Sequence, residues 1–325
     1  MTSSGHVLAL CGGVGGAKLA FGLAHLLPAE ALTIAVNTGD DFEHLGLSIS
    51  PDLDTVTYTL SGLADRERGW GLAGETWNFM AQLRRLGGET WFSLGDRDLA
   101  THVLRTLRLA EGADLSAVTT EIGGRLGLPD IVAPMSDDAV RTMVDTEGGA
   151  LAFQHYFVRE QCRPRATGVR YLGADAARPS LRFAAALTRP DLAAIIVCPS
   201  NPFLSVGPLL ALPGVRQAIA ASAAPCVAVS PIVAGKALKG PAAKLMAELG
   251  IEPSVEGIAD HYAGLIDGLI LDVNDVSLGV RVEARGVVAR AVPSIMTTDE
   301  ERIALARTTL GFAAELADAA TRKTN

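Results

Sequence analysis

Residues 7–27, VLALCGGVGGAKLAFGLAHLL, form the stretch that decides the fold. The five apolar residues Val7–Cys11 are typical of a strand that is covered on both faces. Four glycines follow, and they let the backbone turn without clashes from a Cβ atom: Gly12, Gly13, Gly15 and Gly16. A helix with leucines along one face comes next and ends before Pro28. We therefore expect a buried strand, a glycine turn and a helix at the centre of the protein.

This glycine turn favours a phosphate group as its ligand. A strand that enters a helix through glycines directs backbone N–H groups and the positive end of the helix dipole at one point. The spacing G-G-x-G-G is not the dinucleotide pattern G-x-G-x-x-G, and Lys18 follows the last glycine by two positions. The turn therefore matches neither an NAD fingerprint nor a Walker A loop. By itself it also fits a tight connection that binds nothing.

The composition indicates a globular protein of the cytoplasm. Of the 325 residues, 49% are hydrophobic and 20% are charged, which argues against disorder. No apolar run approaches the roughly 20 residues of a membrane helix, and the N-terminal MTSSGHV lacks the basic region of a signal peptide. The formal net charge of −8 provides no basic footprint, so we expect neither nucleic acid nor a membrane as a partner. The four widely spaced cysteines are typical of buried, reduced thiols.

Strand and helix patterns alternate along most of the chain. Strands are predicted at residues 32–36, within 91–98, and at 192–198, 227–229, 268–273 and 287–292, with helices at 56–63, 78–86, 99–109, 119–126, 207–221, 242–249 and from 298. This order predicts a Rossmann-like, three-layer αβα fold with a mainly parallel sheet. A hairpin pattern around residues 147–149 interrupts it. We interpret residues 111–182 as a smaller inserted cap subdomain in a single domain, with residues 1–110 and 183–325 as its core.

Four acidic residues follow the second predicted strand: Asp40, Asp41, Asp52 and Asp54. The first two lie just past the carboxyl end of that strand, where ligands bind in parallel sheets, and the other two lie in a proline-marked turn. Mg²⁺ prefers carboxylate oxygens but takes only one or two of them beside phosphate and water. We predict Asp40 and Asp54 as metal ligands. Asp is also common as a helix cap and a turn former, which is the alternative role for any of the four.

Basic residues and two further strand ends complete the candidate site. Arg97 follows a predicted strand, and three lysines are further candidates: Lys18, Lys236 and Lys239. The strands at 192–198 and 227–229 both end in loops rich in Ser and Pro, which repeat the geometry of the first turn. Their residues are candidates for contacts to a phosphate-bearing ligand: Ser200, Asn201, Pro202, Ser230, Pro231, Gly235 and Lys236.

Seven blocks, in order from Ala9 to about Pro293, resemble one protein family. They are GGVGGAKLAFGLA, VNTGDDFEHLGLSISPDLDTVTYTLSG, RGWGLAGETWNF, WFSLGDRDLATH, FQHYFVRE, CPSNPFLSVGPLLALPGVR and VSPIVAGKALKGPA. These blocks are similar to the CofD-like family of 2-phospho-L-lactate transferases, which includes the FbiA-type enzymes. Several blocks in sequence are far more specific than any single glycine turn.

The resemblance implies a Mg²⁺-dependent transferase of coenzyme F-420 biosynthesis that forms a homodimer. Members of this family join a phospho-hydroxyacid, carried as a guanosine diphosphate adduct, to the ribityl hydroxyl of the deazaflavin Fo and release GMP. The acid is 2-phospho-L-lactate, phosphoenolpyruvate or 3-phosphoglycerate. We identify no residue that distinguishes these three acids.

The resemblance also implies roles for the candidate residues. The guanosine diphosphate moiety would lie on Gly12–Gly16 and on the two Ser/Pro loops, with four further contacts: Lys18, Asn37, Thr38 and Arg97. Asp40 and Asp54 would hold Mg²⁺, and Asp41 or Asp52 would orient or deprotonate the ribityl hydroxyl. Aromatic segments would supply flat walls for the deazaflavin ring or belong to the core: Trp70, Trp77, Trp91 and His155–Phe157.

Two alternatives from other classes are considered. A regulatory protein of the gluconeogenesis-factor type resembles this family in fold and binds a dinucleotide or nucleotide-sugar without transfer chemistry. The PDLDT, WFSLGDRD and FQHYF blocks favour the transferase over this alternative. An NAD-dependent oxidoreductase is disfavoured because the glycine spacing is wrong.

Overall fold

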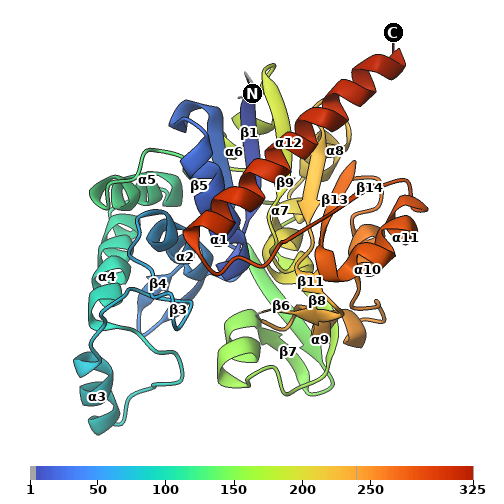
Figure 1. The fold of residues 1–325 in the computed structure, drawn as a ribbon. Coiled ribbons are helices and arrows are strands. Elements are labelled where there is room, and N and C mark those ends of the chain that lie inside the picture. Colours follow the sequence, from blue (N-terminus) through green and yellow to red (C-terminus); the bar gives the residue numbers. More distant parts are fainter. Residues whose placement is uncertain (1–4, 239, 325) are drawn as a thin grey trace.

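A computed structural model describes residues 5–238 and 240–324 of the chain. Its central feature is a seven-stranded sheet in which all neighbouring strands are parallel (Figure 1). In spatial order the strands are β14 (Val288–Val292), β13 (Gly268–Asp272), β10 (Cys226–Val229), β9 (Leu192–Val197), β1 (His6–Cys11), β2 (Leu32–Val36) and β5 (Val132–Pro134). The predicted Rossmann-like αβα fold is confirmed.

Strand β1 lies at the point where the strand order reverses. From β1 the chain adds β2 and β5 on one side, and it later adds β9, β10, β13 and β14 on the other. Open α/β sheets bind their ligands in the crevice outside the carboxyl ends of the strands at such a position. The glycines after β1 and the loop after β9 therefore border the same crevice.

Helices cover both faces of the sheet, and the alternation of side chains along β1 shows why. Val7, Ala9 and Cys11 pack on one face, while Leu8 and Leu10 pack on the other, and all five are fully buried. The first face is covered by α1 (Gly13–Leu26), α2 (Pro51–Leu60) and the long C-terminal α12 (Asp299–Thr324), which crosses the sheet in Figure 1. The second face is covered by α6 (Leu181–Leu187), α7 (Gly207–Ala211) and α8 (Val215–Ala220).

Smaller elements surround the carboxyl edge of the sheet. A hairpin of β3 (Phe42–His44) and β4 (Leu47–Ile49) precedes a helical group of α3 (Asn78–Arg85), α4 (Asp96–Ala110) and α5 (Leu115–Arg125). Beyond β10 come β11 (Ile232–Val233), β12 (Lys236–Ala237), α9 (Ala242–Glu248), α10 (Val255–His261) and α11 (Gly279–Glu283). Four short helical segments complete the chain: η1 (Ala29–Ala31), η2 (His155–Arg159), η3 (Pro202–Val206) and η4 (Val273–Leu278).

The region predicted as an inserted cap, residues 111–182, only partly leaves the main sheet. Its β5 pairs with β2 and forms the edge of that sheet, because the apolar residues 131–133 are buried against it. The separate unit is the antiparallel sheet of β6 (Arg141–Thr146), β7 (Gly149–Ala152) and β8 (Ala166–Leu172). The predicted hairpin at residues 147–149 is confirmed, whereas the predicted start of a separate unit at residue 111 is not.

Three predicted boundaries differ from the structure. Helix α1 begins at Gly13, so Gly15 and Gly16 lie in its first turn. Helix α2 begins at Pro51, which suits the first helical position because proline lacks an N–H group. Asp52 and Asp54 are therefore helical residues, not turn residues. No strand forms within 91–98; instead α4 begins at Asp96, which accepts hydrogen bonds from Thr76, Asn78 and Phe79.

Gly15→Ala is expected to lower the free energy of unfolding by about 2 kcal/mol. A Cβ atom at Gly15 would overlap the backbone carbonyl oxygen of Pro199, in the loop after β9, and the backbone there cannot yield cheaply. Gly124→Ala is the matched control, since Gly124 is an exposed residue of α5 with open space around its Cα. We expect it to raise stability by about 0.5–1 kcal/mol. Equal unfolding temperatures for the two variants would contradict the proposed contact.

Candidate active site

A cleft of about 750 Å³ opens at the switch point of the sheet. Its walls come from the carboxyl ends of the central strands, the first turns of α1 and α2, helix α4, the segment around η2, and the loop before α12. Eleven of the residues predicted from the sequence line it: Gly12, Gly13, Gly15, Lys18, Asp40, Asp52, Asp54, Ser200, Asn201, Ser230 and Pro231. This volume is within the range of small-molecule sites.

Eight predicted residues are not among those that line the cleft: Gly16, Asn37, Thr38, Asp41, Arg97, Pro202, Gly235 and Lys236. Asn37 lies directly behind the wall and binds two of its carboxylates. Arg97 is turned away, because its guanidinium donates to the carbonyl of Ala73 and its backbone N–H to Glu75. Lys236 is an exposed residue of β12. Lys239 lies outside the described residues.

The glycine turn is tightened by contacts from other loops. The backbone N–H of Gly13 donates to Asp52 Oδ1 at 2.8 Å, and the N–H of Gly12 donates to Ser200 Oγ at 3.2 Å. These two N–H groups are therefore already occupied, which differs from the expectation that the whole turn is free for phosphate. Gly15 lies on the cleft wall in the first turn of α1, where backbone N–H groups have no partner within the helix. The first turn of α1 is therefore the part of this segment that fits a phosphate group.

Asp40 and Asp52 meet at Asn37. The Asn37 amide donates to Asp40 Oδ1 and to Asp52 Oδ2, both at 2.9 Å, and Gln154 donates to Asp40 Oδ2 at 3.3 Å. Asp41 points elsewhere, because its Oδ2 accepts from the Ser50 hydroxyl at 2.8 Å. The hydrogen-bond partners that the described residues provide to these three acids are all neutral.

Burial makes ionisation of these acids unfavourable. It raises the pKa of Asp40 well above its usual range, and the negative charges of Asp52 and Asp41 raise it further. Burial also raises the pKa of Asp41 to about 7 and that of Asp52 to about 6. A divalent cation on the cleft side would offset this cost, so Asp40 and Asp52 fit a Mg²⁺ site.

Asp54 has a different environment from the one predicted. Both of its carboxylate oxygens contact the guanidinium of Arg105, one of them at 3.1 Å, and both residues are buried. The guanidinium of Arg105 therefore supplies a positive charge that faces Asp54. That Asp54 binds a metal ion stays a prediction. It requires one carboxylate oxygen of Asp54 to leave Arg105 and bind the ion.

Three residues of this network are not among those predicted from the sequence. Asp98, His102 and Arg105 lie on one face of α4, and Tyr58 of α2 donates to Asp98 Oδ1 at 2.7 Å. His102 Nε2 lies 3.3 Å from Asp98 Oδ2, and His102 Nδ1 lies 3.2 Å from Arg105. Their spacing of four and then three residues was the available signal, because such residues share one face of a helix.

Asp54, Asp98 and His102 also bring three possible metal-ligand atoms within 4.8 Å of one another. The Arg105 guanidinium already contacts two of these residues, and it supplies a positive charge at the same place. We therefore assign this group to positioning and charge balance beside the cleft, and Asp40, whose hydrogen-bond partners are neutral, is the better fit to a metal ion.

Part of the cleft is apolar and flat. The rings of Phe153 and Phe157 are stacked with centroids 5.4 Å apart and 17° between their planes, and both line the cleft together with the half-exposed Trp70. Trp77, Trp91 and Tyr156 do not line it; Tyr156 is fully buried, with Lys244 donating to its hydroxyl at 3.0 Å. The structure thus separates wall residues from core residues within the predicted aromatic segments.

A parallel sheet with a ligand cleft at its switch point defines the class of doubly wound α/β proteins. Comparisons with known proteins are more specific. The model of the family described as 2-phospho-L-lactate transferase CofD matches residues 7–304. This chain belongs to that family, and it is a transferase of coenzyme F-420 biosynthesis.

Curated relatives cover almost the whole chain. A protein of Kitasatospora aureofaciens named phosphoenolpyruvate transferase is 43% identical over 96% of this chain and 98% of its own length. One of the same name from Streptomyces coelicolor is 41% identical over 97% and 100%. A Methanosarcina mazei protein named 2-phospho-L-lactate transferase is 37% identical over 91% and 96%. The prediction of an enzyme is therefore confirmed over that of a purely regulatory protein.

Solved structures agree on the fold. Two crystal structures of a Bacillus halodurans protein, one described as a member of the UPF0052 family, superpose with TM-scores of 0.62 and 0.64. Each covers 94% of this chain at 17% identity. Separately, no helix in residues 5–238 and 240–324 is long and apolar enough to cross a membrane.

Proposed function

We propose that the chain transfers a three-carbon phospho-acid from its guanosine diphosphate adduct to the ribityl hydroxyl of the deazaflavin Fo, with Mg²⁺, and releases GMP. The observation that carries this proposal is the cleft itself. One wall offers the first turn of α1 and two neutral-partnered carboxylates, and another offers stacked aromatic rings. A pyrophosphate with a metal ion suits the first wall, and a flat heteroaromatic ring suits the second.

In the proposed reaction the ribityl oxygen attacks the phosphorus that carries the acid. A new P–O bond to Fo forms, the P–O bond to GMP breaks, and the hydroxyl proton goes to a carboxylate of the enzyme. Bound Mg²⁺ would neutralise the pyrophosphate oxygens, with Asp40 as the ligand that faces the cleft. The first turn of α1 orients the phosphates, and this alignment supplies much of the rate enhancement.

Asp52 is the proton acceptor in this proposal. It lines the cleft, and the Gly13 N–H and the Asn37 amide hold its two oxygens in place at 2.8 and 2.9 Å. The alternative base, Asp41, does not line the cleft, and its Oδ2 accepts from Ser50. Asp41 instead supports the loop that carries Asp40.

Phosphoenolpyruvate is the first donor acid to test. Several relatives at 37–43% identity carry the name phosphoenolpyruvate transferase, while those named 2-phospho-L-lactate transferase are 36–37% identical. 2-Phospho-L-lactate and phosphoenolpyruvate differ only in a methyl or a methylene group, while 3-phosphoglycerate carries its phosphate on carbon 3.

The experiment is to incubate the purified protein with Fo, Mg²⁺ and each guanylylated acid, and to detect the phosphodiester product by mass. We expect product with at least one acid, GMP in equal amount, and none after chelation of Mg²⁺. Failure with all three acids would contradict the proposed function. Light scattering of the same sample tests the proposed homodimer, and a monomer would contradict it.

A further inference from the structure

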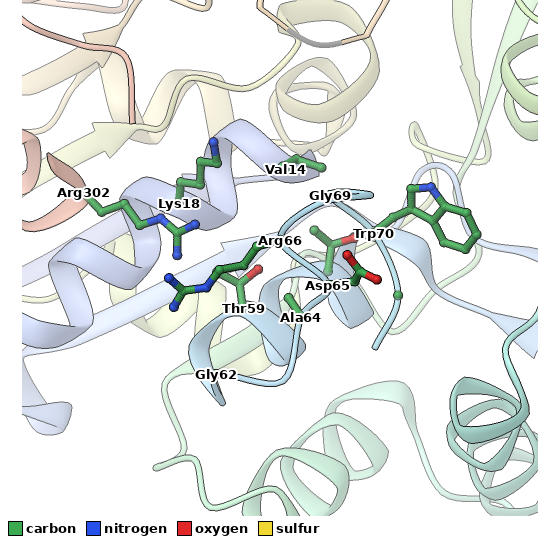
Figure 2. A pocket seen from close by; sticks show the side chains of 12 residues that line it. Val14, Lys18, Thr59, Gly62, Ala64, Asp65, Arg66, Gly69, Trp70 and Arg302 are labelled. Carbon is green, nitrogen blue, oxygen red and sulfur yellow. The ribbon is translucent and has the colours of Figure 1, made fainter. Parts of the chain in front are cut away.

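A second, smaller cavity lies beside the cleft, enclosed by α1, α2, the loop of residues 62–71 and α12 (Figure 2). Its volume is about 40 Å³, enough for a few water molecules or one small anionic group. Six residues line both cavities: Val14, Lys18, Thr55, Gly69, Trp70 and Gly71. A ligand in the cleft can therefore extend into it.

Three cationic side chains from distant parts of the chain surround this cavity. They are Lys18 of α1, Arg66 of the loop after α2 and Arg302 of α12. Figure 2 shows the guanidinium groups of Arg66 and Arg302 directed toward one another. Lys18 donates to the carbonyl of Met296 at 2.5 Å, on the side where the cavity meets the cleft.

The two arginines share one carboxylate. Asp299 Oδ2 lies 2.8 Å from Arg66, and Asp299 Oδ1 lies 3.0 Å from Arg302. The lining carboxylate, Asp65, is used locally, because it accepts from the backbone N–H groups of Glu67 and Arg68 at 3.0 and 2.9 Å. Positive charge around the cavity thus exceeds negative charge.

Arg302 is the least compensated member of the group. It is only 5% exposed, and its Nε finds no hydrogen-bond partner among the described residues. Burial lowers its pKa, and the positive charge of Arg66 lowers it further. An anion beside the two guanidiniums would offset both the burial of the Arg302 charge and its repulsion by Arg66.

We propose that Lys18, Arg66 and Arg302 bind the carboxylate of the transferred acid. This inference rests on the proposed function. Thr55, shared by both cavities, lies three residues after Asp52 on the same face of α2, so the subsite adjoins the proposed base. In phosphoenolpyruvate and 2-phospholactate the carboxylate is bonded to the carbon that carries the phosphate oxygen, so the carboxylate and the reacting phosphate are close together. In 3-phosphoglycerate the carboxylate is one carbon further from the phosphate.

The test compares two ligands that differ only in the carboxylate: the guanosine diphosphate adduct of 2-phospho-L-lactate, and the isopropyl ester of GDP, in which a methyl group replaces the carboxylate. Binding of each is measured by titration calorimetry with Mg²⁺ and without Fo. Arg66→Gln is the main variant, because the Arg66 side chain is 55% exposed and its loss is tolerable for folding. Arg125→Gln is the matched control, with a side chain 65% exposed and a carboxylate, Glu121, at 2.9 Å.

We expect Arg66→Gln to weaken binding of the acid adduct about tenfold to a hundredfold and binding of the isopropyl ester less than about twofold. Arg125→Gln should change neither. Equal losses for both ligands would assign the group to the pyrophosphate and overturn the carboxylate assignment. Unchanged affinities with a lowered unfolding temperature would show that the arginines only tether α12.

A second variant separates this inference from the proposed function. Asp299→Asn removes the carboxylate that the ligand would replace, so it should tighten binding of the acid adduct; weaker binding would contradict the inference. If wild-type protein makes product while Arg66→Gln shows no selective loss, only the subsite is wrong. If wild-type protein binds neither ligand, both proposals are wrong.

Discussion

Asp40→Asn is expected to lower the kcat of transfer by about 10³-fold. The fold should persist, because an asparagine amide oxygen can still accept from Asn37, and because burial and two neighbouring carboxylates disfavour a charge at this position. Removing that charge should leave the unfolding temperature in chelator unchanged or raise it. The stabilisation of the wild-type protein by added Mg²⁺ should disappear in the variant, since Asp40 is the proposed ligand.

Asp145→Asn is the control for this experiment. Asp145 is a carboxylate of the small sheet, paired with Arg170 at 2.7 Å, and it is not among the residues that line the cleft. It should retain both turnover and the thermal shift with Mg²⁺. Activity of Asp40→Asn within about tenfold of wild type would remove Asp40 from the mechanism. A preserved Mg²⁺ shift would move the metal site to other residues.

Arg105→Met is expected to lower the free energy of unfolding by about 3–5 kcal/mol. Arg105 is 3% exposed, and its guanidinium binds Asp54, His102 and the carbonyl of Ser48. Methionine has a similar length but leaves Asp54 buried without its cation. An uncompensated buried charge costs more than the lost ion pair contributes. Urea titration followed by circular dichroism measures the effect.

The double variant Asp54→Asn with Arg105→Met tests this physical reason. Removing both charges leaves no uncompensated carboxylate, so the double variant should be more stable than Arg105→Met alone. Its unfolding free energy would then lie closer to that of the wild-type protein. If the double variant loses as much unfolding free energy as Asp54→Asn and Arg105→Met lose together, the ion pair contributes no coupling energy. The transfer activity of the double variant is measured separately from its unfolding free energy.

Local patterns in the sequence predicted much of the architecture. Val7–Cys11 is apolar throughout because both faces of β1 are covered, and Pro51 lies where a helix begins. The helix predicted from residue 298 begins with a capping box, since Glu301 accepts from the N–H of Thr298 at 2.9 Å. The predicted strand within 91–98 is wrong, because Asp96 collects hydrogen bonds from Thr76 and residues 78–79 and thereby starts α4 early.

Partners distant in sequence could not be predicted in this way. The local pattern around Asp54 shows an acid near the start of a helix, but it does not show that Arg105 lies against it. The same holds for Asp41, which turns toward Ser50 and away from the cleft. Which carboxylate meets a cation is decided by the placement of α4 beside α2, where Tyr58 contacts Asp98 and Asp54 contacts Arg105.

The sequence by itself determined the glycine turn after β1, the alternation of strands and helices, and the family blocks, because these are set by residues close together in the chain. Only the tertiary structure decided that β1 lies between β2 and β9. It also decided that Gly15 lies too close to the Pro199 carbonyl for a larger residue, and that Lys18 and Arg302 line one cavity. The physical reason is that backbone conformation follows local sterics and hydrogen bonds, whereas charge pairing and cavities follow from the way separate elements pack.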